Sequence, residues 1–312
     1  MKAIMKQALA NIAGKLGYSI VPNWRKDNLV IVEHLRKLFA LLEVDLVIDV
    51  GANEGQYYRF LRDFVGYRGN VVSFEPLPHL AARLQDRARK DPIWTVEACA
   101  LGGAPGRASF NVMNDTQFSS LLQPTRQETL EYQECNTVEQ KIDVSVRTLS
   151  EVLPELRQRF GARSIYLKTD TQGYDLEVLR GGGEDLSSLS ALQAELAVTR
   201  FYEGAPRYHE VIGYLEDRGF ALSAIFPNNV GQFPRWFEFD CYMINMDACA
   251  AVGKGRGLPP NRAADRETTG AGADAAISRR VQERPTDTKQ PIVPAWMTNE
   301  DAAARFCGIA LT

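Results

Sequence analysis

One stretch constrains the fold of this chain more than any other: residues 46–55, Leu-Val-Ile-Asp-Val-Gly-Ala-Asn-Glu-Gly. Its first five residues are apolar and mostly β-branched apart from Asp49, which is typical of a strand covered on both faces. Gly51 and Gly55 allow a turn with positive φ and the close approach of a ligand, and Asn53 tolerates a left-handed conformation better than most residues. A helix is expected next, so the stretch predicts a strand–turn–helix unit of an α/β protein.

This turn has three possible functional interpretations. The alternative is a turn that binds nothing, since glycines are common between strands and helices. A dinucleotide site needs the spacing G-x-G-x-x-G, but the turn has only G-x-x-x-G. A phosphate-binding loop ends in Gly-Lys-Ser/Thr, which is absent here. A carboxylate at the strand tip, Asp49, suits a ligand with positive charge, such as S-adenosylmethionine (SAM) with its ammonium and sulfonium groups.

A second strand also ends in an acid, which argues against a turn that binds nothing. Residues 70–76, Asn-Val-Val-Ser-Phe-Glu-Pro, place Glu75 at the strand end, and Pro76 stops the strand. Nucleotide-binding α/β units place a carboxylate on ribose hydroxyls about 20 residues after the first turn. Glu75 is therefore a candidate ribose ligand, with a plain surface acid as the alternative.

Four motifs together resemble the FkbM family of SAM-dependent methyltransferases. They are Asp-Val-Gly-Ala-Asn-Glu-Gly (49–55), Phe-Glu-Pro (74–76), Ala-Leu-Gly (100–102) and Lys-Thr-Asp-Thr-Gln-Gly-Tyr-Asp (168–175). The resemblance covers roughly residues 30–245. It implies a class I methyltransferase fold, O-methylation as the usual chemistry, and sugars or sugar-containing natural products as frequent acceptors.

The predicted fold class is therefore α/β: a Rossmann-like class I methyltransferase with a seven-stranded sheet, helices on both faces, and an N-terminal helical extension. We expect this extension at 1–43 and the methyltransferase domain at 44–247. Residues 248–312 are expected to form a largely disordered tail, because Gly, Ala, Pro, Arg and Thr dominate there and apolar periodicity disappears.

Apolar periodicity places the other elements along the chain. Helices are predicted at 28–43, 54–65, 78–90 and 206–218, and one begins near Gln172. Strands are predicted at 93–100, 109–112, 142–146, 164–169, 192–198, 220–226 and 238–244. We interpret 109–112 and 142–146 as an added antiparallel pair, and the polar segment between them, 114–140, as a loop over the active site that contacts substrate or acts as a structural flap.

Composition limits the partners. The net charge is −3 over 312 residues with no basic stripe, so no nucleic-acid partner is expected. No run reaches the roughly 20 apolar residues of a membrane span, and the helical pattern in 1–22 would pack on a protein surface or associate weakly with a membrane. The five cysteines show no C-x-x-C pair, and Cys99 and Cys241 lie in apolar runs, which favours buried free thiols and a cytoplasmic location. The oligomeric state is not predicted.

The predicted cofactor site combines the two strand-end acids, the turn, and the residues that the resemblance places beside the adenine. Asp49 and Glu75 would hold the methionine and ribose ends of SAM. The predicted cofactor-binding residues are Asp49, Gly51, Asn53, Gly55, Glu75, Pro76, Ala100, Leu101 and Asp170.

The catalytic candidates are Asp170, Glu195 and His209, in that order. Asp170 ends a strand beside the central one, where ligands collect in α/β sheets, and would act as base, metal ligand or anchor for the SAM ammonium. Glu195 lies one strand further, and a neutral His209 would suit a base near pH 7. The family often carries acids near Gln172 and after Leu149, where this chain has Ser150, so dependence on a divalent metal stays open.

The predicted function is transfer of a methyl group from SAM to a hydroxyl of a sugar, glycan, or glycosylated or polyketide natural product. Two alternatives remain at this point. One is an NAD-type oxidoreductase acting on a nucleotide sugar, which needs the phosphate-binding turn that the sequence lacks. The other is a non-catalytic module that keeps the fold and binds SAM.

Overall fold

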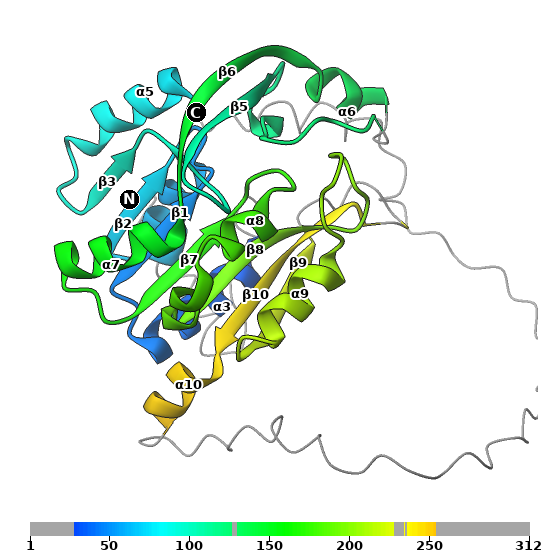
Figure 1. Ribbon diagram of the computed structural model, residues 1–312. Helices are drawn as coiled ribbons and strands as arrows, with labels where there is room; N and C mark the ends of the chain where they lie inside the picture. Colours follow the sequence, from blue (N-terminus) through cyan, green and yellow to red (C-terminus); the bar gives the residue numbers. More distant parts are fainter. Residues whose placement is uncertain (1–27, 127–129, 228–233, 235, 254–312) are drawn as a thin grey trace, which may run out of the picture. The chain divides into compact units, whose positions relative to one another are not determined.

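The computed structural model describes residues 28–126, 130–227, 234 and 236–253 (Figure 1). All of them belong to one compact unit. The helical pattern predicted in 1–22, and the predicted tail from 254 onward, lie outside the described residues.

A seven-stranded sheet forms the centre of this unit (Figure 1). In spatial order its strands are β3 (Trp94–Glu97), β2 (Asn70–Phe74), β1 (Leu46–Val50), β7 (Ile165–Thr169), β8 (Ala191–Ala197), β10 (Glu238–Asn245) and β9 (Phe220–Pro227). The first five strands pair in parallel, whereas β10 is antiparallel to both of its neighbours. Parallel strands closed by an antiparallel pair confirm the predicted class I, Rossmann-like sheet.

Helices cover both faces of the sheet. They are α3 (Leu29–Leu42), α4 (Gln56–Arg59), α5 (Pro78–Ala88), α6 (Leu130–Cys135), α7 (Leu149–Phe160), α8 (Asp175–Arg180), α9 (Tyr208–Glu216) and α10 (Met246–Gly253), with shorter helical turns at Phe60–Val65, Thr116–Phe118 and Gly183–Ser188. The last helix, α10, occupies residues that composition assigned to the start of the tail. None of the helices in the described part of the chain is long and apolar enough to cross a membrane.

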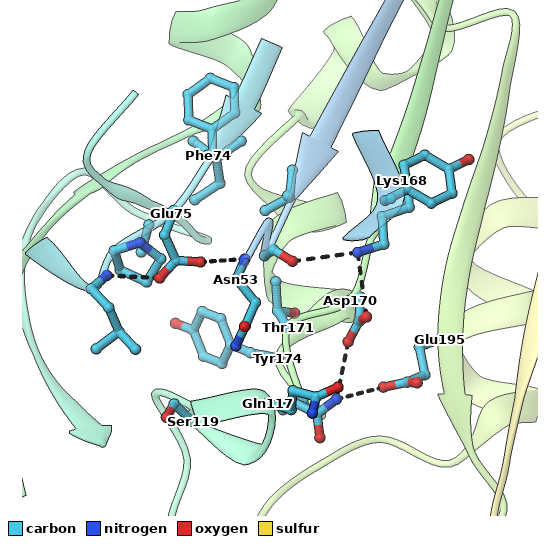
Figure 2. Close-up of a pocket in the computed structure, with 18 of the residues that line it drawn as sticks. Asn53, Phe74, Glu75, Gln117, Ser119, Lys168, Asp170, Thr171, Tyr174 and Glu195 are labelled. Carbon is cyan, nitrogen blue, oxygen red and sulfur yellow. Dashed lines mark hydrogen bonds and ion pairs between the residues drawn. The ribbon is translucent and has the colours of Figure 1, made fainter. Parts of the chain in front are cut away.

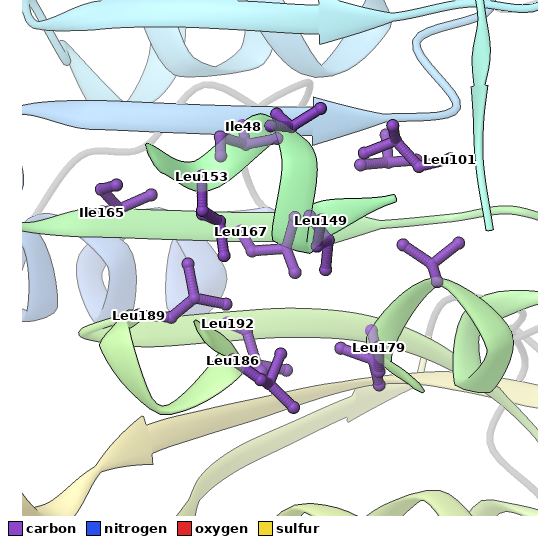
Figure 3. Close-up of a cluster of buried hydrophobic side chains, with 14 of the residues drawn as sticks. Ile48, Leu101, Leu149, Leu153, Ile165, Leu167, Leu179, Leu186, Leu189 and Leu192 are labelled. Atoms are coloured by element: carbon purple, nitrogen blue, oxygen red, sulfur yellow. The ribbon is translucent and has the colours of Figure 1, made fainter. Parts of the chain in front are cut away.

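Alternation along the strands separates the two cores, because successive side chains of a strand point to opposite faces. Leu46 and Ile48 of β1 pack with α7, α8 and α9, and Figure 3 shows this cluster around Leu153 and Leu179. Val47 of the same strand packs on the opposite face with α3 and the segment that follows α4. The apolar positions of β1 therefore anchor helices on both sides and hold the turn after it in place.

A second, three-stranded sheet lies beside the first. It consists of β4 (Ala100–Leu101), β6 (Val138–Arg147) and β5 (Gly106–Met113), with β6 antiparallel to β5. The predicted antiparallel pair is confirmed, but the single strand predicted at 93–100 is wrong. Glu97 is the last residue paired with β2, and the chain then crosses to the second sheet, where Ala100 pairs with Val146 of β6.

The segment predicted as a loop at 114–140 contains a helical turn and α6, so it is more ordered than the sequence indicated. The crossover helix predicted at 54–65 also differs, since α4 is only one turn long and continues as a π-helix over Phe60–Val65. Cys99 and Cys241 are buried free thiols, as predicted.

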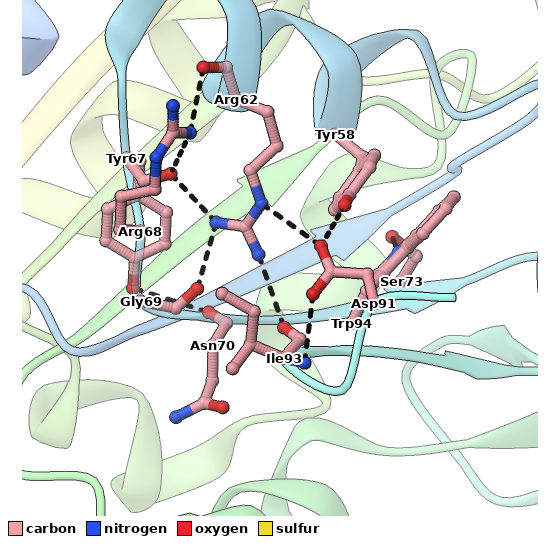
Figure 4. A network of polar contacts seen from close by, with 10 residues as sticks. All are labelled: Tyr58, Arg62, Tyr67, Arg68, Gly69, Asn70, Ser73, Asp91, Ile93 and Trp94. Carbon is pink, nitrogen blue, oxygen red and sulfur yellow. Dashed lines mark hydrogen bonds and ion pairs between the residues drawn. The ribbon is translucent and has the colours of Figure 1, made fainter. Parts of the chain in front are cut away.

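A buried guanidinium connects this π-helix to the edge of the sheet (Figure 4). Arg62 donates hydrogen bonds to the carbonyl groups of Tyr67 (2.9 Å), Gly69 (3.0 Å) and Ile93 (3.3 Å). It also forms an ion pair with Asp91 at 3.6 Å. Arg62 thereby fixes the loop before β2 and the start of β3, and only the planar five-donor group of arginine can serve all four acceptors.

We expect Arg62→Lys to lower the free energy of unfolding by about 2 kcal/mol, because an ammonium leaves at least one of these buried carbonyls without a donor. Urea unfolding of the purified chain measures the change. Arg89→Lys is the matched control, since that side chain is 78% exposed and forms an ion pair with the exposed Asp86, and it should stay within about 0.5 kcal/mol of the unmodified chain. Equal effects of the two changes would contradict the structural role of Arg62.

Candidate functional site

A row of polar side chains crosses the centre of the large sheet on the face covered by α3. Register places Ser73 opposite Asp49, Asp49 opposite Lys168, Lys168 opposite Gln193, and Gln193 opposite Tyr242. Directly paired residues share a face of a sheet, so these five side chains lie in line across four strand boundaries. A polar row inside a buried sheet is costly unless its groups pair with one another.

Lys168 is the cation of this row and pairs with two acids. Its Nζ lies 3.4 Å from Asp49 Oδ1 and 3.3 Å from Asp170 Oδ2, and it donates a hydrogen bond of 3.4 Å to the Gly51 carbonyl. Although burial alone would lower it, Asp170 and Asp49 raise the pKa of Lys168 well above its usual value. Lys168 therefore stays charged and joins the ends of β1 and β7.

Asp49 is fully buried beneath the turn and accepts a hydrogen bond of 3.1 Å from the Ser73 hydroxyl. Burial raises its pKa, while Lys168 and Ser73 act in the opposite direction. Asp49 does not line the cavity described below, so its described contacts are those of a residue that positions Lys168 and the turn.

The turn after β1 adopts the left-handed conformations expected from its sequence, with φ of 79° at Gly51, 45° at Asn53 and 76° at Gly55. Each N–H group in 51–55 donates a hydrogen bond within the protein. The acceptors are Phe74 O for residues 51 and 52, Glu75 Oε2 for 53, Gln56 Oε1 for 54, and Ala52 O for 55. This turn therefore does not present a set of free donors to a phosphate.

A cavity of about 370 Å³ opens at the carboxyl ends of the parallel strands (Figure 2). One part of its wall is mostly apolar and is formed by Phe74, Pro76, Leu77, Ala100, Leu101 and Phe110, with Glu75 at its edge. The opposite part carries Lys168, Asp170, Gln172, Gln193, Glu195 and Asp240. Thr116, Gln117 and Ser119 bring the 114–140 segment into the lining. The volume lies within the range of small-molecule sites.

The structure brings most of the predicted site residues together. Those that line the cavity are Gly51, Asn53, Glu75, Pro76, Ala100, Leu101, Asp170 and Glu195. Three predicted residues do not line it: Asp49 is buried below, Gly55 faces the side chains of Leu84 and Trp94, and His209 is exposed on α9. His209 is thus not placed to act on a ligand in this cavity.

Four residues of the acidic part of the wall were not predicted from the sequence: Lys168, Gln172, Gln193 and Asp240. A signal for Lys168 was present, because it stands two residues before Asp170 and therefore shares its face of the strand. Gln193 precedes Glu195 by the same spacing. Asp240 comes from the antiparallel closing strand, where register places it opposite Glu195.

The Gln172 amide holds two carboxyl groups together. Its Nε2 donates to Asp170 Oδ1 at 3.0 Å and to Glu195 Oε2 at 2.8 Å. Burial would raise the pKa of Asp170, but Lys168, Gln172 and a hydrogen bond with Glu195 lower it below its ordinary value. Burial and the charge of Asp170 raise the pKa of Glu195 well above its ordinary value. The opposite shifts favour an ionised Asp170 beside a protonated Glu195, as expected for like charges at close range.

Glu75 accepts hydrogen bonds from the N–H groups of Asn53 (2.6 Å) and Leu77 (2.8 Å), which fix its carboxylate at the cavity edge. Burial raises its pKa from 4.5 to about 7, although these two hydrogen bonds act against the shift. A shift of this size corresponds to about 3 kcal/mol of pH-dependent stability.

We therefore expect stability to depend on pH through Glu75. Its folded pKa lies above the unfolded value, so its contribution is present in full below pH 4.5 and is lost as the pH rises through about 7. Glu75→Gln should give a shallower fall of unfolding free energy between pH 5 and 8 than the unmodified chain, as measured by urea unfolding. The exposed Glu54→Gln should keep the original slope, and an unchanged slope in Glu75→Gln would contradict the assignment.

Among the described residues, no group of three or more His, Cys, Asp or Glu side chains has the arrangement of a metal site.

A family model and two related proteins indicate the same family. The model of the Methyltransferase FkbM domain matches residues 49–222. The 2-O-methyltransferase NoeI of Sinorhizobium fredii is 27% identical over 220 residues, which are 67% of this chain and 84% of that protein. Methyltransferase sdnD of Sordaria araneosa is 25% identical over 214 residues, which are 62% of this chain and 80% of that protein.

Similarity to solved structures is more distant. The crystal structure of a methyltransferase FkbM from Methylobacillus flagellatus shares 14% identity and superposes with a TM-score of 0.40. The match covers 64% of this chain and 44% of that one, so the chain spans less than half of the length of that protein.

Proposed function

We propose that this chain, which belongs to the FkbM methyltransferase family and is a SAM-dependent methyltransferase, transfers the methyl group of SAM to a hydroxyl of a sugar, glycan or glycosylated natural product. The observation that carries the proposal is the cavity at the carboxyl ends of the strands, with an apolar wall and Glu75 at one side and an acidic wall at the other. We further propose that it acts in the cytoplasm, in agreement with its free cysteines.

The residues present fit SAM by their chemistry. The apolar wall suits a flat purine, and the fixed carboxylate of Glu75 suits ribose hydroxyls, which donate hydrogen bonds. Across the cavity, Asp170, Glu195 and Asp240 face only one cation, Lys168, among the described lining residues. An excess of acids suits the ammonium and sulfonium groups. When bound, SAM supplies an electrophilic methyl group on a positively charged sulfur.

The hydrogen bonds of the turn favour this proposal over a nicotinamide cofactor. A dinucleotide pyrophosphate is bound by free N–H groups of the turn and the helix that follows. Here the five N–H groups of residues 51–55 already have protein acceptors, and the Glu75 carboxylate, which would repel a phosphate, occupies the Asn53 donor. An NAD-type oxidoreductase therefore finds less support in the turn.

The acidic wall is also the proposed place where the acceptor loses its proton. A sugar hydroxyl is a weak nucleophile, and a carboxylate within hydrogen-bonding reach lowers the barrier to its attack. Asp170 is ionised, is 36% exposed in the cavity, and is held by Lys168 and Gln172, so it is our proposed base. The name of the rhizobial relative, a 2-O-methyltransferase, supports an oxygen acceptor.

Methyl transfer from labelled SAM to a panel of sugars and glycosylated compounds tests the proposal. For an acceptor that is methylated, we expect Asp170→Asn to reduce kcat at least 100-fold while SAM still binds, because a positioned base contributes roughly 100- to 10,000-fold. Asp217→Asn, an exposed acid at the end of α9, is the matched control. Full activity of Asp170→Asn would exclude its catalytic role.

A further inference from the structure

Glu195 lines two cavities rather than one. In addition to the large cavity, it lines a second cavity of about 10 Å³, which is about the space of one water molecule. Asp175 and Glu238 also line this small cavity, together with Tyr202. Among the described residues, Glu195 of β8 is thus the one that lines both the proposed ligand site and a water-sized space with further acids.

The contacts on the large-cavity side tie Glu195 to Asp170. Both carboxyl groups accept hydrogen bonds from the same Gln172 nitrogen, at 2.8 Å and 3.0 Å. Because both of these carboxyl groups accept, the amide nitrogen of Gln172 must face them. The amide oxygen in turn accepts a hydrogen bond of 3.0 Å from the Tyr202 hydroxyl. Two carboxyl groups that accept from one nitrogen lie close together, and like charges at this range favour one proton shared between them.

The charges around this pair come from four elements. Lys168 of β7 and Asp49 of β1 face it from the centre of the sheet, Asp175 from α8, and Asp240 and Glu238 from β10. Lys168 is the one basic group in this set, so a proton shared by Asp170 and Glu195 limits the excess negative charge in the absence of a ligand. A cation that enters the large cavity would take over this role.

We infer that Glu195 is a proton-transfer residue: the proton it shares with Asp170 leaves through the small cavity, towards Glu238, when the cationic methyl donor enters the large cavity. This inference rests on the proposed function. In the first step the O–H bond of the Glu195 carboxyl breaks, the proton passes to water in the small cavity, and Glu238 relays a proton to the solvent. The pair is then fully ionised, and one of its oxygens takes the proton of the acceptor hydroxyl as the new methyl–oxygen bond forms.

The small cavity provides a path along which this proton can leave. Glu238 lines the small cavity and is only partly buried, so its carboxyl group is placed to exchange a proton with the solvent. Burial, and then the charges of Asp170, Asp175 and Asp240, raise its pKa to about 8, which makes it able to accept and release a proton near neutral pH. Glu195 is the group that borders both spaces and holds a proton, so the path runs through it.

Proton counting tests the inference without an acceptor. The full chain is titrated calorimetrically with SAM at pH 7 in two buffers of different ionisation enthalpy, and the difference in heat gives the protons exchanged on binding. We expect the unmodified chain to release roughly one more proton per bound SAM than Glu195→Gln. The demethylated product, whose sulfur is neutral, should cause less release. The exposed Glu216→Gln is the matched control and should behave as the unmodified chain does.

The outcomes distinguish a failure of the role of Glu195 from a failure of the proposed function. Equal proton release by the unmodified chain and Glu195→Gln, with SAM bound in both, would overturn the role of Glu195 and leave the proposed function intact. A chain that does not bind SAM would overturn the proposed function and this inference with it. If Glu195→Gln does not fold, infrared difference spectra of the unmodified chain decide: SAM should remove the absorption of one protonated carboxyl group, and its persistence would refute the inference.

Discussion

Gly51→Ala should destabilise the chain by about 3 kcal/mol or more and weaken SAM binding at least roughly 100-fold. A Cβ atom at Gly51 would lie 2.0 Å from the backbone carbonyl oxygen of Asp170, and Gly51 has a φ of 79°. Backbone atoms at the end of β7 cannot move aside without displacing Asp170, so the change alters the site as well as the fold. Thermal or urea unfolding and a SAM titration of the same variant measure both effects.

Gly66→Ala separates steric overlap from backbone strain. Gly66 has a φ of 78°, almost the same as that of Gly51, but its added Cβ would meet no described atom within 4 Å. It should therefore show only the cost of a left-handed alanine, about 1 kcal/mol, and normal SAM binding. If both alanine variants lose the same stability, the close approach of β1 and β7 at Gly51 is not what the structure indicates.

Lys168→Met should cost about 3–5 kcal/mol at neutral pH, because it leaves Asp49 charged, fully buried and without its cation. The loss should be larger at pH 7.5 than at pH 5. Without Lys168 the pKa of Asp49 rises further, so the variant keeps its stability while Asp49 is protonated and loses it as the pH rises. Urea unfolding at the two pH values measures this difference.

The double variant Asp49→Asn, Lys168→Met supplies the control. In the double variant Asp170 still lacks its cation, but it is 36% exposed and accepts a hydrogen bond from Gln172, so removing both buried charges should recover most of the stability lost in Lys168→Met. A loss of less than about 1 kcal/mol in Lys168→Met, or a loss that does not change with pH, would show that the ion pair across β1 and β7 is not structural.

The sheet and its turn could be predicted because they depend on local sequence. Apolar runs fixed the positions of the strands, and Gly51, Asn53 and Gly55 adopt the left-handed conformations that their residue types allow. The clustering of the acids at the strand ends could also be predicted, since parallel strands present their carboxyl ends at one edge of the sheet. Glu75 and Asp170 line the cavity for this reason.

The remaining features depend on pairing between distant segments. Asp49 also stands near a strand end, yet register places it opposite Lys168, where it is buried as a counter-ion. The path of residues 98–101 into the second sheet depends on pairing with β6, which lies far along the chain. Asp240 reaches the acidic wall because the last strand runs antiparallel, which no local pattern indicates.

Calorimetric titration of the purified chain with SAM, with its demethylated product and with NAD, each separately, tests the central claim most directly. We predict that SAM and its product bind with one site per chain and that NAD gives no binding heat. Binding of NAD, or no binding of SAM, would contradict the assignment of this cavity to a methyl donor.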